Sequence, residues 1–378
     1  MFAVAMNILV VPDKFKGTLT ARAAADAIAR GWRSARPKDR LVLLPMSDGG
    51  DGFGSVMGTM LNARRHADTT LDAAHRPCKS HWWWHAKTKT AVVESAAVIG
   101  LAMLPHGRFH PFQLDTFGLG KILRAAIKRG ARRILVGIGG SATNDGGFGM
   151  ACALGWRFLD ATGRVIEQWT ELHRLNEIRP PSPARRSSRI QIIVASDVEN
   201  PLLGDSGATR VYGPQKGMRP RDFAAAESAL SRLALTVREQ FNRDFATMPG
   251  AGAAGGLGFG LAAFLGAKFE SGFDMFAELS DLEARLRKAD LVITAEGRMD
   301  PSSLMGKGAG QVAVRCSQFK VPCIGLAGDV THPRALRRLF KQVYALTDLT
   351  TKDNAMSKAG HWLEKLAAHS ARNMTAKA

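Results

Sequence analysis

The stretch RRILVGIGGSATNDGG, residues 132 to 147, joins a short apolar run to a loop rich in glycine and small polar residues. The run Ile134 to Val136 has the β-branched, apolar character of a strand that is buried on both faces. Glycine in the loop permits tight turns and lets the backbone approach a ligand closely. A strand that ends in such a loop is typical of α/β proteins, which bind ligands beyond the carboxyl ends of their strands.

The same unit recurs along the chain: an apolar run, a polar or glycine-rich segment, and then sequence of helical character. The other instances are NILVVPDKFKG (7–17), RLVLLPMSDGGDG (40–52), RIQIIVASDVENP (189–201), ADLVITAEGRMD (289–300) and VPCIGLAGD (321–329). Between them, Leu230, Leu233, Val237 and Phe241 recur at helical spacing. Buried strands that alternate with helices predict an α/β fold with a parallel sheet.

The length of the chain indicates more than one domain. Its 378 residues, 46% of them hydrophobic, exceed what a single core usually holds, so we expect two domains with a cleft. No apolar run is long enough to span a bilayer, and the opening residues lack the basic region of a signal peptide. We therefore expect a cytoplasmic protein without a membrane partner. Four cysteines lack a metal-binding or paired spacing and are predicted to be buried or free thiols: Cys78, Cys152, Cys316 and Cys323.

The formal net charge of +19 raises the question of nucleic-acid binding. However, the lysines and arginines are mixed with acidic residues, and no basic stripe carries stacking aromatics. The densest basic stretch, 179–189, is rich in proline and serine and is predicted to be a solvated loop. A small anionic substrate accounts for the charge better, so we expect no nucleic-acid partner. A homo-oligomer is compatible with the sequence.

Polar side chains gather where the predicted strands end. They are Asp13 and Lys14, Asp48, Ser141 to Asp145, Asp197, Glu296 and Arg298, and Asp329. A turn or helix cap would explain any one of them. Six strands that all end in this way favour a shared binding site instead.

One alternative follows from Gly137-x-Gly139-x-x-Ala142, which formally satisfies the dinucleotide-binding fingerprint. Asp160 ends the strand-like segment GWRFLD at the distance expected for a ribose acceptor. Against this, the strand that bears the fingerprint comes third in the chain, and the loop continues with polar groups that a pyrophosphate turn does not need. An NAD-dependent dehydrogenase of a small hydroxy acid remains the alternative.

Two further glycine loops favour a nucleotide polyphosphate over NAD. Residues 250–260, GAGAAGGLGFG, precede a predicted helix and serve either phosphate binding or close packing. Residues 47–52, SDGGDG, add two carboxylates suited to a divalent metal. The sequence has neither a Walker motif nor the protein-kinase signatures, so a phosphotransferase of another class is indicated.

Seven segments in order resemble the signature blocks of the bacterial glycerate kinases of the glyoxylate and glucarate pathways. They are PDKFKGTLTA (12–21), MSDGGDG (46–52), GIGGSATNDGG (137–147), ASDVENPLLG (195–204), YGPQKG (212–217), PGAGAAGGLGFG (249–260) and ITAEGRMDPSSLMGKG (293–308). The resemblance implies phosphorylation of D-glycerate by ATP, usually to 2-phosphoglycerate. It also implies a Rossmann-like domain, residues 1–70 and 285–378, joined to an inserted α/β domain, residues 71–284, with the active site in the cleft.

Phosphoryl transfer needs cationic clamps, metal-bridging carboxylates and a base near the attacking hydroxyl. We predict that Asp197 is the base, because it ends a buried strand and Asn200-Pro201 fixes the next turn. Lys14 is the predicted catalytic cation. The other predicted contacts are Asp13, Lys16, Ser141, Thr143, Asn144, Asn200, Arg298 and Lys307 for substrate or phosphate, Gly139, Gly140, Gly252, Gly255 and Gly256 for nucleotide, and Asp48, Asp51, Glu296 and Asp300 for Mg²⁺. A capping role for Asp197 and a solvated surface role for the lysines are the alternatives. A protein that binds a small anion without turnover would keep the loops and tolerate loss of Asp197.

Two segments depart from the family pattern. Thr116-Phe-Gly-Leu-Gly-Lys121 stands where the family commonly has Thr/Ser-x-Gly-Thr-Gly-Glu, so a hydroxyl is lost and a carboxylate is replaced by a cation. In SHWWWHA, residues 80–86, a strand would place His81, Trp83 and His85 on one face and the other tryptophans on the opposite face. A histidine pair for a metal is one interpretation, and tryptophans that fill a core or subunit interface are the favoured one.

Overall fold

The computed structural model describes residues 5–181, 190–301, 303 and 308–374. The chain divides into two compact units, Met1–Asp48 with Phe273–Ala378, and Gly49–Gly272. The sequence places the boundaries after residues 70 and 284 instead. The second unit begins earlier because α2 (Phe53–Met60) packs on β4 and β5, and β3 (Arg64–Leu71) pairs with β4.

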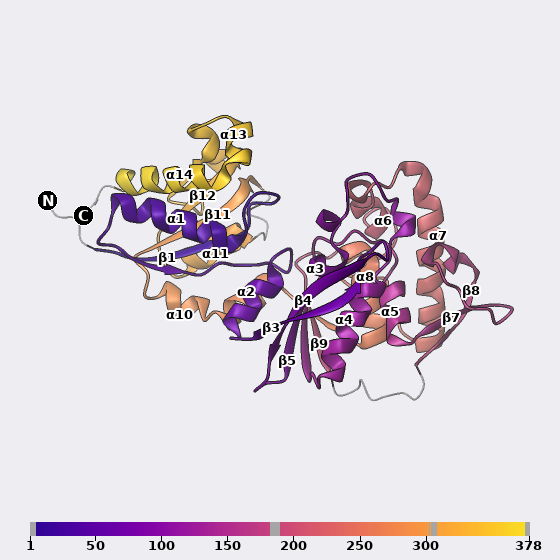
Figure 1. Ribbon diagram of the computed structural model, residues 1–378. Coiled ribbons are helices and arrows are strands. Elements are labelled where there is room, and N and C mark those ends of the chain that lie inside the picture. The colour runs from indigo at the N-terminus through magenta and orange to yellow at the C-terminus, as the bar shows by residue number, and fades with distance from the viewer. Residues whose placement is uncertain (1–4, 182–189, 302, 304–307, 375–378) are drawn as a thin grey trace. The chain divides into compact units, whose positions relative to one another are not determined.

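The first unit is built on a five-stranded parallel sheet (Figure 1). In spatial order its strands are β13 (Gln342–Ala345), β12 (Cys323–Val330), β11 (Leu291–Met299), β1 (Asn7–Pro12) and β2 (Arg40–Leu43). Ile8 and Val10 pack toward α1 (Ala21–Ala35) and α14 (Ala359–Asn373), and α11 (Gly308–Gln318) covers the other face. Coverage of both faces explains why the strands read as unbroken apolar runs. The shorter helices are α9 (Gly272–Leu279), α10 (Leu282–Leu286), α12 (Pro333–Leu336), η7 (Leu346–Asp348) and α13 (Lys352–Ser357).

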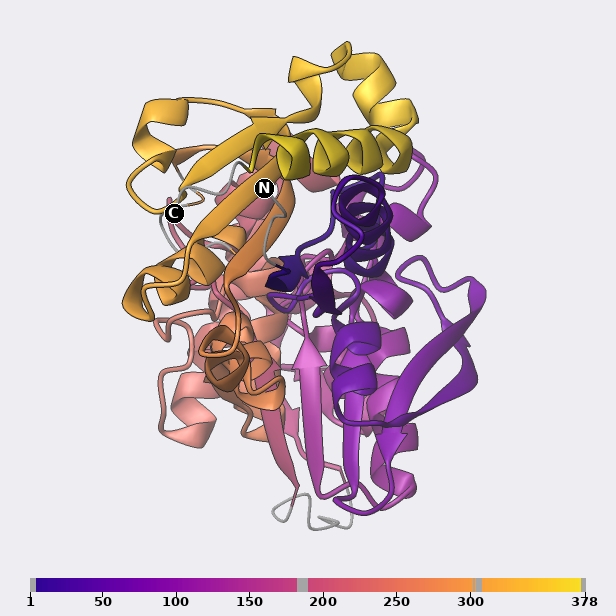
Figure 2. The ribbon, with the colours of Figure 1, turned by 90° about the vertical axis from the view of Figure 1, so that its left-hand side faces the viewer.

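The second unit contains a six-stranded mixed sheet, whose strands Figure 2 shows side by side. In spatial order they are β10 (Lys268–Glu270), β9 (Gln191–Ala195), β6 (Arg133–Gly137), β5 (Thr90–Glu94), β4 (Pro77–His85) and β3. The first four run parallel, and β4 and β3 continue the sheet antiparallel. The six strands predicted from apolar runs are therefore confirmed, four in the first sheet and two in the second.

Helices form two layers over one face of the second sheet. α4 (Phe117–Lys128) and α8 (Ala253–Leu265) pack on Ile134 and Val136. Behind α8 lies a second core, where Leu230, Leu233 and Val237 of α7 (Pro220–Phe241) are buried as predicted. This core also includes α5 (Phe148–Leu154), β7 (Arg157–Asp160) and β8 (Leu175–Arg179). The remaining short elements are α3 (Ala96–Ile99), η1 (Leu101–Met103), η2 (Pro111–Gln113), η3 (Trp169–Arg174), α6 (Ala208–Tyr212) and η5 (Pro214–Lys216).

The tryptophan run lies on β4 and alternates between its faces, as predicted. Trp82 and Trp84 are buried in the core under α4, and the Trp82 Nε1 donates to Asp68 Oδ2 at 2.6 Å. Trp83 lies on the other face against Gly54 and Gly58 of α2. A packing role therefore accounts for all three side chains.

Two further observations concern the chain as a whole. All four cysteines are free thiols, buried or half-buried, which confirms the prediction. Of the helices in the described part of the chain, none has the length and apolar character needed to cross a membrane.

Candidate active site

The carboxyl edge of the first sheet carries a group of charged side chains that we call the strand-end cluster: Asp13, Lys14, Asp48 and Glu296. Asp13 directly follows β1 and is only 9% exposed. Burial, followed by the charge of Asp48, raises the pKa of Asp13 to about 7, and Glu296 adds to this while Lys14 opposes it. Lys14 Nζ lies 3.9 Å from Asp48 Oδ1. A buried carboxyl that titrates near neutrality among other charged groups is typical of a functional site.

Other predicted residues lie on the same sheet. Arg298 is adjacent to Asp329 of β12 in the strand register, and its Nε lies 3.8 Å from Asp300 Oδ2. Lys16 is exposed on the loop after β1. Lys307 lies outside the described residues.

The loop that follows β6, residues 137–147, is the glycine loop of the second unit. Gly139 N donates to Gly49 O at 3.1 Å, and the Asp51 carboxylate lies against Gly140. Gly140 has a φ of +79°, a conformation that glycine adopts without strain. The turn Gly139–Gly140 is therefore locked to the start of this unit, and it is the only part of the loop that is not buried. Asp48 and Asp51, predicted as a metal-binding pair, belong to different units.

The polar side chains of the glycine loop face inward. Ser141 is 5% exposed, and Thr143 and Asn144 are fully buried. Ser141 Oγ donates to Ala254 O at 3.0 Å, and Asn144 Nδ2 donates to Thr209 Oγ1 at 3.1 Å. Thr143 Oγ1 and Asn144 Oδ1 are buried and have no hydrogen-bond partner in the described parts of the chain. The side chains predicted to bind substrate oxygens thus lie inside the loop.

The second glycine segment packs against the first. Ala254, Gly255 and Gly256 are successive left-handed residues, with φ of 57°, 73° and 83°. A Cβ at Gly255 would overlap the Thr143 carbonyl, and Gly146 N donates to Gly255 O at 3.1 Å. A Cβ at Gly252 would overlap Pro201 O in the same way. Close packing, one of the two roles considered from the sequence, accounts for these glycines.

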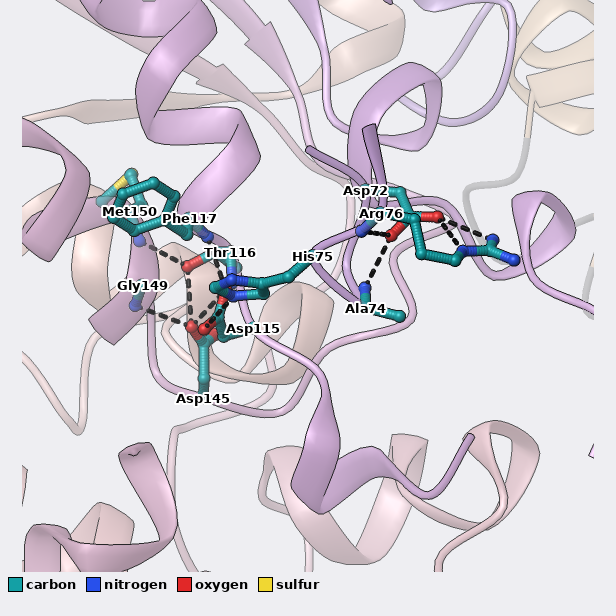
Figure 3. A network of polar contacts seen from close by, with 10 residues as sticks. All are labelled: Asp72, Ala74, His75, Arg76, Asp115, Thr116, Phe117, Asp145, Gly149 and Met150. Carbon is teal, nitrogen blue, oxygen red and sulfur yellow. Dashed lines mark hydrogen bonds and ion pairs between the residues drawn. The ribbon is translucent and has the colours of Figure 1, made fainter. Parts of the chain in front are cut away.

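A buried carboxylate, Asp145, ties the glycine loop to α4 (Figure 3). Its Oδ2 accepts from Thr116 N at 2.9 Å, from Thr116 Oγ1 at 2.7 Å and from Gly149 N at 2.9 Å. Burial and the charge of Asp115 raise the pKa of Asp145 to about 6. Residues 116–121 depart from the family pattern. Within them, Thr116 has a structural role through its hydrogen bonds with Asp145, whereas Lys121 is exposed.

The same network continues to a histidine that sequence reasoning did not identify. His75 Nε2 lies 2.7 Å from Asp115 Oδ2, and this hydrogen bond raises the pKa of His75. Near this histidine in the sequence, Arg76 Nε donates to Asp72 Oδ2 at 2.7 Å (Figure 3). These pairs hold the turn after β3 in place.

The predicted base, Asp197, lies just beyond β9 and is exposed, and its Oδ1 accepts from Gly272 N at 3.0 Å. Asn200 uses both of its polar atoms within the protein. Its Nδ2 donates to Ser206 O at 2.8 Å, and Tyr212 OH donates to its Oδ1 at 2.7 Å. Asn200 therefore fixes the loop that leads to α6.

Sequence reasoning also missed two buried charged residues. Glu94, at the end of β5, accepts from Gly52 N and Gly54 N, both at 2.9 Å, and so holds the start of α2. Lys216, in η5, donates to Thr143 O at 2.6 Å and to Ser141 Oγ at 3.3 Å. The segment YGPQKG was noted only as a family block, and nothing local to it indicates that its lysine is buried.

The structure removes the main support for a dehydrogenase. Asp160 ends β7, which pairs with β8 in a separate two-stranded sheet and is not a strand of either larger sheet. Its carboxylate accepts from Thr162 N at 2.8 Å and from Arg164 N at 3.0 Å. Asp160 therefore organises its own turn rather than following the next strand of the parallel sheet as a ribose acceptor would.

A cavity of about 560 Å³ lies at the opposite edge of the first sheet, between the amino ends of β1 and β2 and helix α10. Asn7, Arg40 and Lys288 are among its lining residues, and none of the predicted site residues lines it. The candidate site is therefore identified by the charged residues at the strand ends and not by this cavity.

Parallel strands that end in charged and glycine-rich loops are typical of α/β proteins that bind ligands beyond the carboxyl ends of their strands. The chain belongs to the glycerate kinase family, whose model matches residues 8–375. It is 37% identical to glycerate 2-kinase of Escherichia coli strain K12 over 94% of both chains, and 36% identical to glycerate kinase of Bacillus subtilis strain 168 over 96% of both. A crystal structure of a Salmonella typhimurium LT2 protein, provisionally described as glycerate kinase 2, matches with a TM-score of 0.82 and 34% identity over 98% of both chains.

Proposed function

We propose that this protein transfers the γ-phosphoryl group of Mg²⁺-bound ATP to D-glycerate and releases 2-phosphoglycerate. The observation that carries the proposal is the strand-end cluster, in which a buried carboxyl with a pKa of about 7 lies beside a lysine and further carboxylates. Membership of the glycerate kinase family supports glycerate as the substrate. The E. coli relative described as a 2-kinase supports the position of the phosphate. Four free thiols fit a reducing compartment such as the cytoplasm, where ATP is supplied.

The strand-end cluster fits a divalent cation. The charges of Asp48 and Glu296 both raise the pKa of Asp13, and a bound cation would relieve that repulsion. Within residues 5–181, 190–301, 303 and 308–374, no three acidic, histidine or cysteine side chains form a metal-binding group. Mg²⁺ commonly needs only one or two carboxylates together with water and phosphate oxygens. Asp48 and Glu296 are the proposed ligands, with Asp51 and Asp300 as the other carboxylates predicted from the sequence.

The cations of the first unit would neutralise charge on the transferring phosphoryl group. Lys14 and Lys16 follow β1 and Arg298 lies on β11, so all three belong to the carboxyl edge of one sheet. Phosphoryl transfer depends mainly on such positioning and charge neutralisation. Mg²⁺, when bound, adds a further positive charge at the phosphate oxygens.

Asp197 is the proposed base that takes the proton of the attacking hydroxyl. Its exposed carboxylate at the end of β9 is accessible to a ligand, and the hydrogen bond from Gly272 N orients it. In the glycine loop, Gly139 N already donates to Gly49 O, so the N–H of the exposed Gly140 is the proposed backbone donor to anionic oxygens. Since the side chains of Ser141, Thr143 and Asn144 are buried, we assign them to the support of this turn.

Release of ADP tests the proposal. Purified protein with Mg²⁺ and ATP should release ADP when D-glycerate is added, and EDTA should abolish this release. L-Glycerate is the matched control, because it has the same charge and functional groups as D-glycerate. ADP release that is independent of D-glycerate, or an absence of release in a protein that binds the substrate, would contradict the proposed function.

A further inference from the structure

Lys216 is a buried lysine that lies directly behind the glycine loop. The residue is 6% exposed, and Asp145 is the charged group that acts on its ammonium. The ammonium donates to Thr143 O at the short distance of 2.6 Å and to Ser141 Oγ at 3.3 Å. Burial of a lysine is costly unless its donors are used, so this contact indicates a specific task.

The contacts of Lys216 continue into the second glycine segment. Ser141 Oγ, which accepts from Lys216, donates in turn to Ala254 O at 3.0 Å. Ala254 has a φ of 57°, which is unfavourable for a residue with a side chain. A single chain of hydrogen bonds therefore links η5, the glycine loop and the left-handed start of α8. A protonated lysine has three N–H donors for such contacts, and a neutral one has fewer.

The surroundings of Lys216 leave its charge sensitive to a ligand. Burial lowers the pKa of Lys216 to about 7, and the charge of Asp145 opposes this. Asp145 is itself buried, and its pKa is raised to about 6. On the neighbouring elements, Arg210 of α6 pairs with Asp205 at 3.3 Å, and Asp222 of α7 pairs with His110 at 3.1 Å. An added negative charge at the loop would favour the ammonium form of Lys216.

We propose that Lys216 is a positioning residue that couples binding of the anionic substrate at the glycine loop to uptake of one proton from solvent. The identity of the anion, D-glycerate, rests on the proposed function. In its ammonium form Lys216 holds the Thr143 carbonyl and the Ser141 hydroxyl, and so keeps the turn Gly139–Gly140 in its binding shape. Without the proton, the amine keeps two N–H donors but loses its charge, so the hydrogen bonds to the Thr143 carbonyl and to the Ser141 hydroxyl both weaken.

The sign of the pH dependence follows from this coupling. Below about pH 7 the lysine already carries its proton, so binding requires no uptake and the affinity stays constant. Above this value the free protein must gain a proton when it binds the anion. The affinity for D-glycerate should therefore fall as the pH rises, by at most about tenfold per pH unit.

Calorimetric titration of the whole protein with D-glycerate tests the coupling. At about pH 8, the heat of binding to the wild type should depend on the ionisation enthalpy of the buffer, in the direction of proton uptake. Lys216→Arg should bind at neutral pH but lose the pH dependence, because arginine keeps its charge. Lys216→Met should bind more weakly, and its dissociation constant should lack the part of the pH dependence between about pH 6 and pH 9 that arises at Lys216. A flat wild-type profile, or a wild-type pH profile retained in Lys216→Met, would overturn the proposal.

The pH dependence of the unfolding free energy, measured without ligand, separates this inference from the proposed function. Because burial lowers the pKa of Lys216, the unfolding free energy of the wild type should rise relative to that of Lys216→Arg between about pH 7 and pH 10. ADP release with a flat binding profile would overturn the role of Lys216 and leave the kinase standing. Normal pH-dependent stability without any glycerate binding would overturn both the substrate and the coupling to it. The wild-type titration needs no variant, so the test stands even if Lys216→Met does not fold.

Discussion

The strand-end cluster and the glycine loop both follow parallel strands, but they differ in how far their polar side chains are exposed to solvent. The cluster collects carboxylates and a lysine beside Asp13, partly open to solvent. The glycine loop buries its polar side chains and presents only the turn Gly139–Gly140. A position at the end of a parallel strand therefore does not determine whether a loop presents charged side chains or a backbone turn. We propose that the charges of the strand-end cluster take part in the reaction, whereas the buried side chains of the glycine loop shape its backbone.

The two regions also differ in the sign of their pH response. Burial brings the pKa of Asp13 up to about 7 and that of Lys216 down to about 7. For Asp13 the folded state loses stability as the pH rises from about 4 to 7. For Lys216 it gains stability as the pH rises from about 7 to 10.5. Asp13 and Lys216 are thus buried groups whose pKa values both lie near neutrality and whose titrations change the stability in opposite directions.

The largest effect is expected from Asp197→Asn, which tests whether the second unit supplies a charged group to the reaction. An amide cannot accept the proton of the attacking hydroxyl, so kcat should fall by about 10²–10⁴-fold. Steady-state ADP release measures the effect, and Asp160→Asn is the matched control at an exposed turn. An unchanged kcat in Asp197→Asn would remove it as the base and leave the first unit as the source of catalytic charge.

Gly255→Ala tests the packed framework of the glycine region. The new methyl group would meet the Thr143 carbonyl in a left-handed backbone conformation, so we expect a loss of about 3 kcal/mol or more in unfolding free energy. Gly266→Ala is the control, because it ends the same helix with a φ of +64° but has open space around it. It should cost only about 1 kcal/mol. Denaturant unfolding that gives equal losses would show that the close approach does not matter.

Asp13→Asn tests the repulsion within the strand-end cluster. A rise in pKa from 3.8 to about 7 sets an upper limit of about 4 kcal/mol on the cost of the ionised carboxyl. With allowance for relaxation and solvent, we expect the variant to be about 2 kcal/mol more stable than the wild type at pH 8. The gain should vanish near pH 4, and kinase activity should fall. A destabilised variant at pH 8 would mean that the carboxylate is well accommodated in the folded protein.

The smallest effect is expected from Lys121→Glu, which restores the charge common in the family at this position. Lys121 is exposed on α4 and lies outside the Asp145 network, so kcat/KM for glycerate should change by less than about twofold. Initial rates at several glycerate concentrations measure this. A change of tenfold or more would place the exposed face of α4 in the substrate path.

Much of the fold is predictable because buried parallel strands leave a clear pattern. Residues 291–295 form a strand for the reason inferred, since helices cover both faces of the first sheet, and residues 134–136 form a strand that is buried along its length. The boundary after Asp48 cannot be inferred from the neighbouring residues, because it depends on the packing of α2 against β4 and β5. The turn SDGGDG therefore reads as one loop although it spans two units.

The site is only partly predictable for a related reason. Sequence identifies which loops are rich in glycine and polar groups, but not which way their side chains face. Ser141 and Asn144 have the residue types of ligand contacts, and the sequence does not reveal that both are buried and hydrogen-bonded to Ala254 and Thr209. Lys216 lies 75 positions from its partner Ser141, so its burial depends on packing that no local pattern reports.

The most direct test of the central claim is to follow carbon-13-labelled D-glycerate by NMR in the presence of the wild-type protein, Mg²⁺ and ATP. The account predicts a product in which phosphorus couples to the carbon that bears the secondary hydroxyl, with ADP formed in equal amount. Phosphorus attached at the primary hydroxyl would contradict the assignment of 2-phosphoglycerate. No phosphorylated glycerate at all would contradict the kinase.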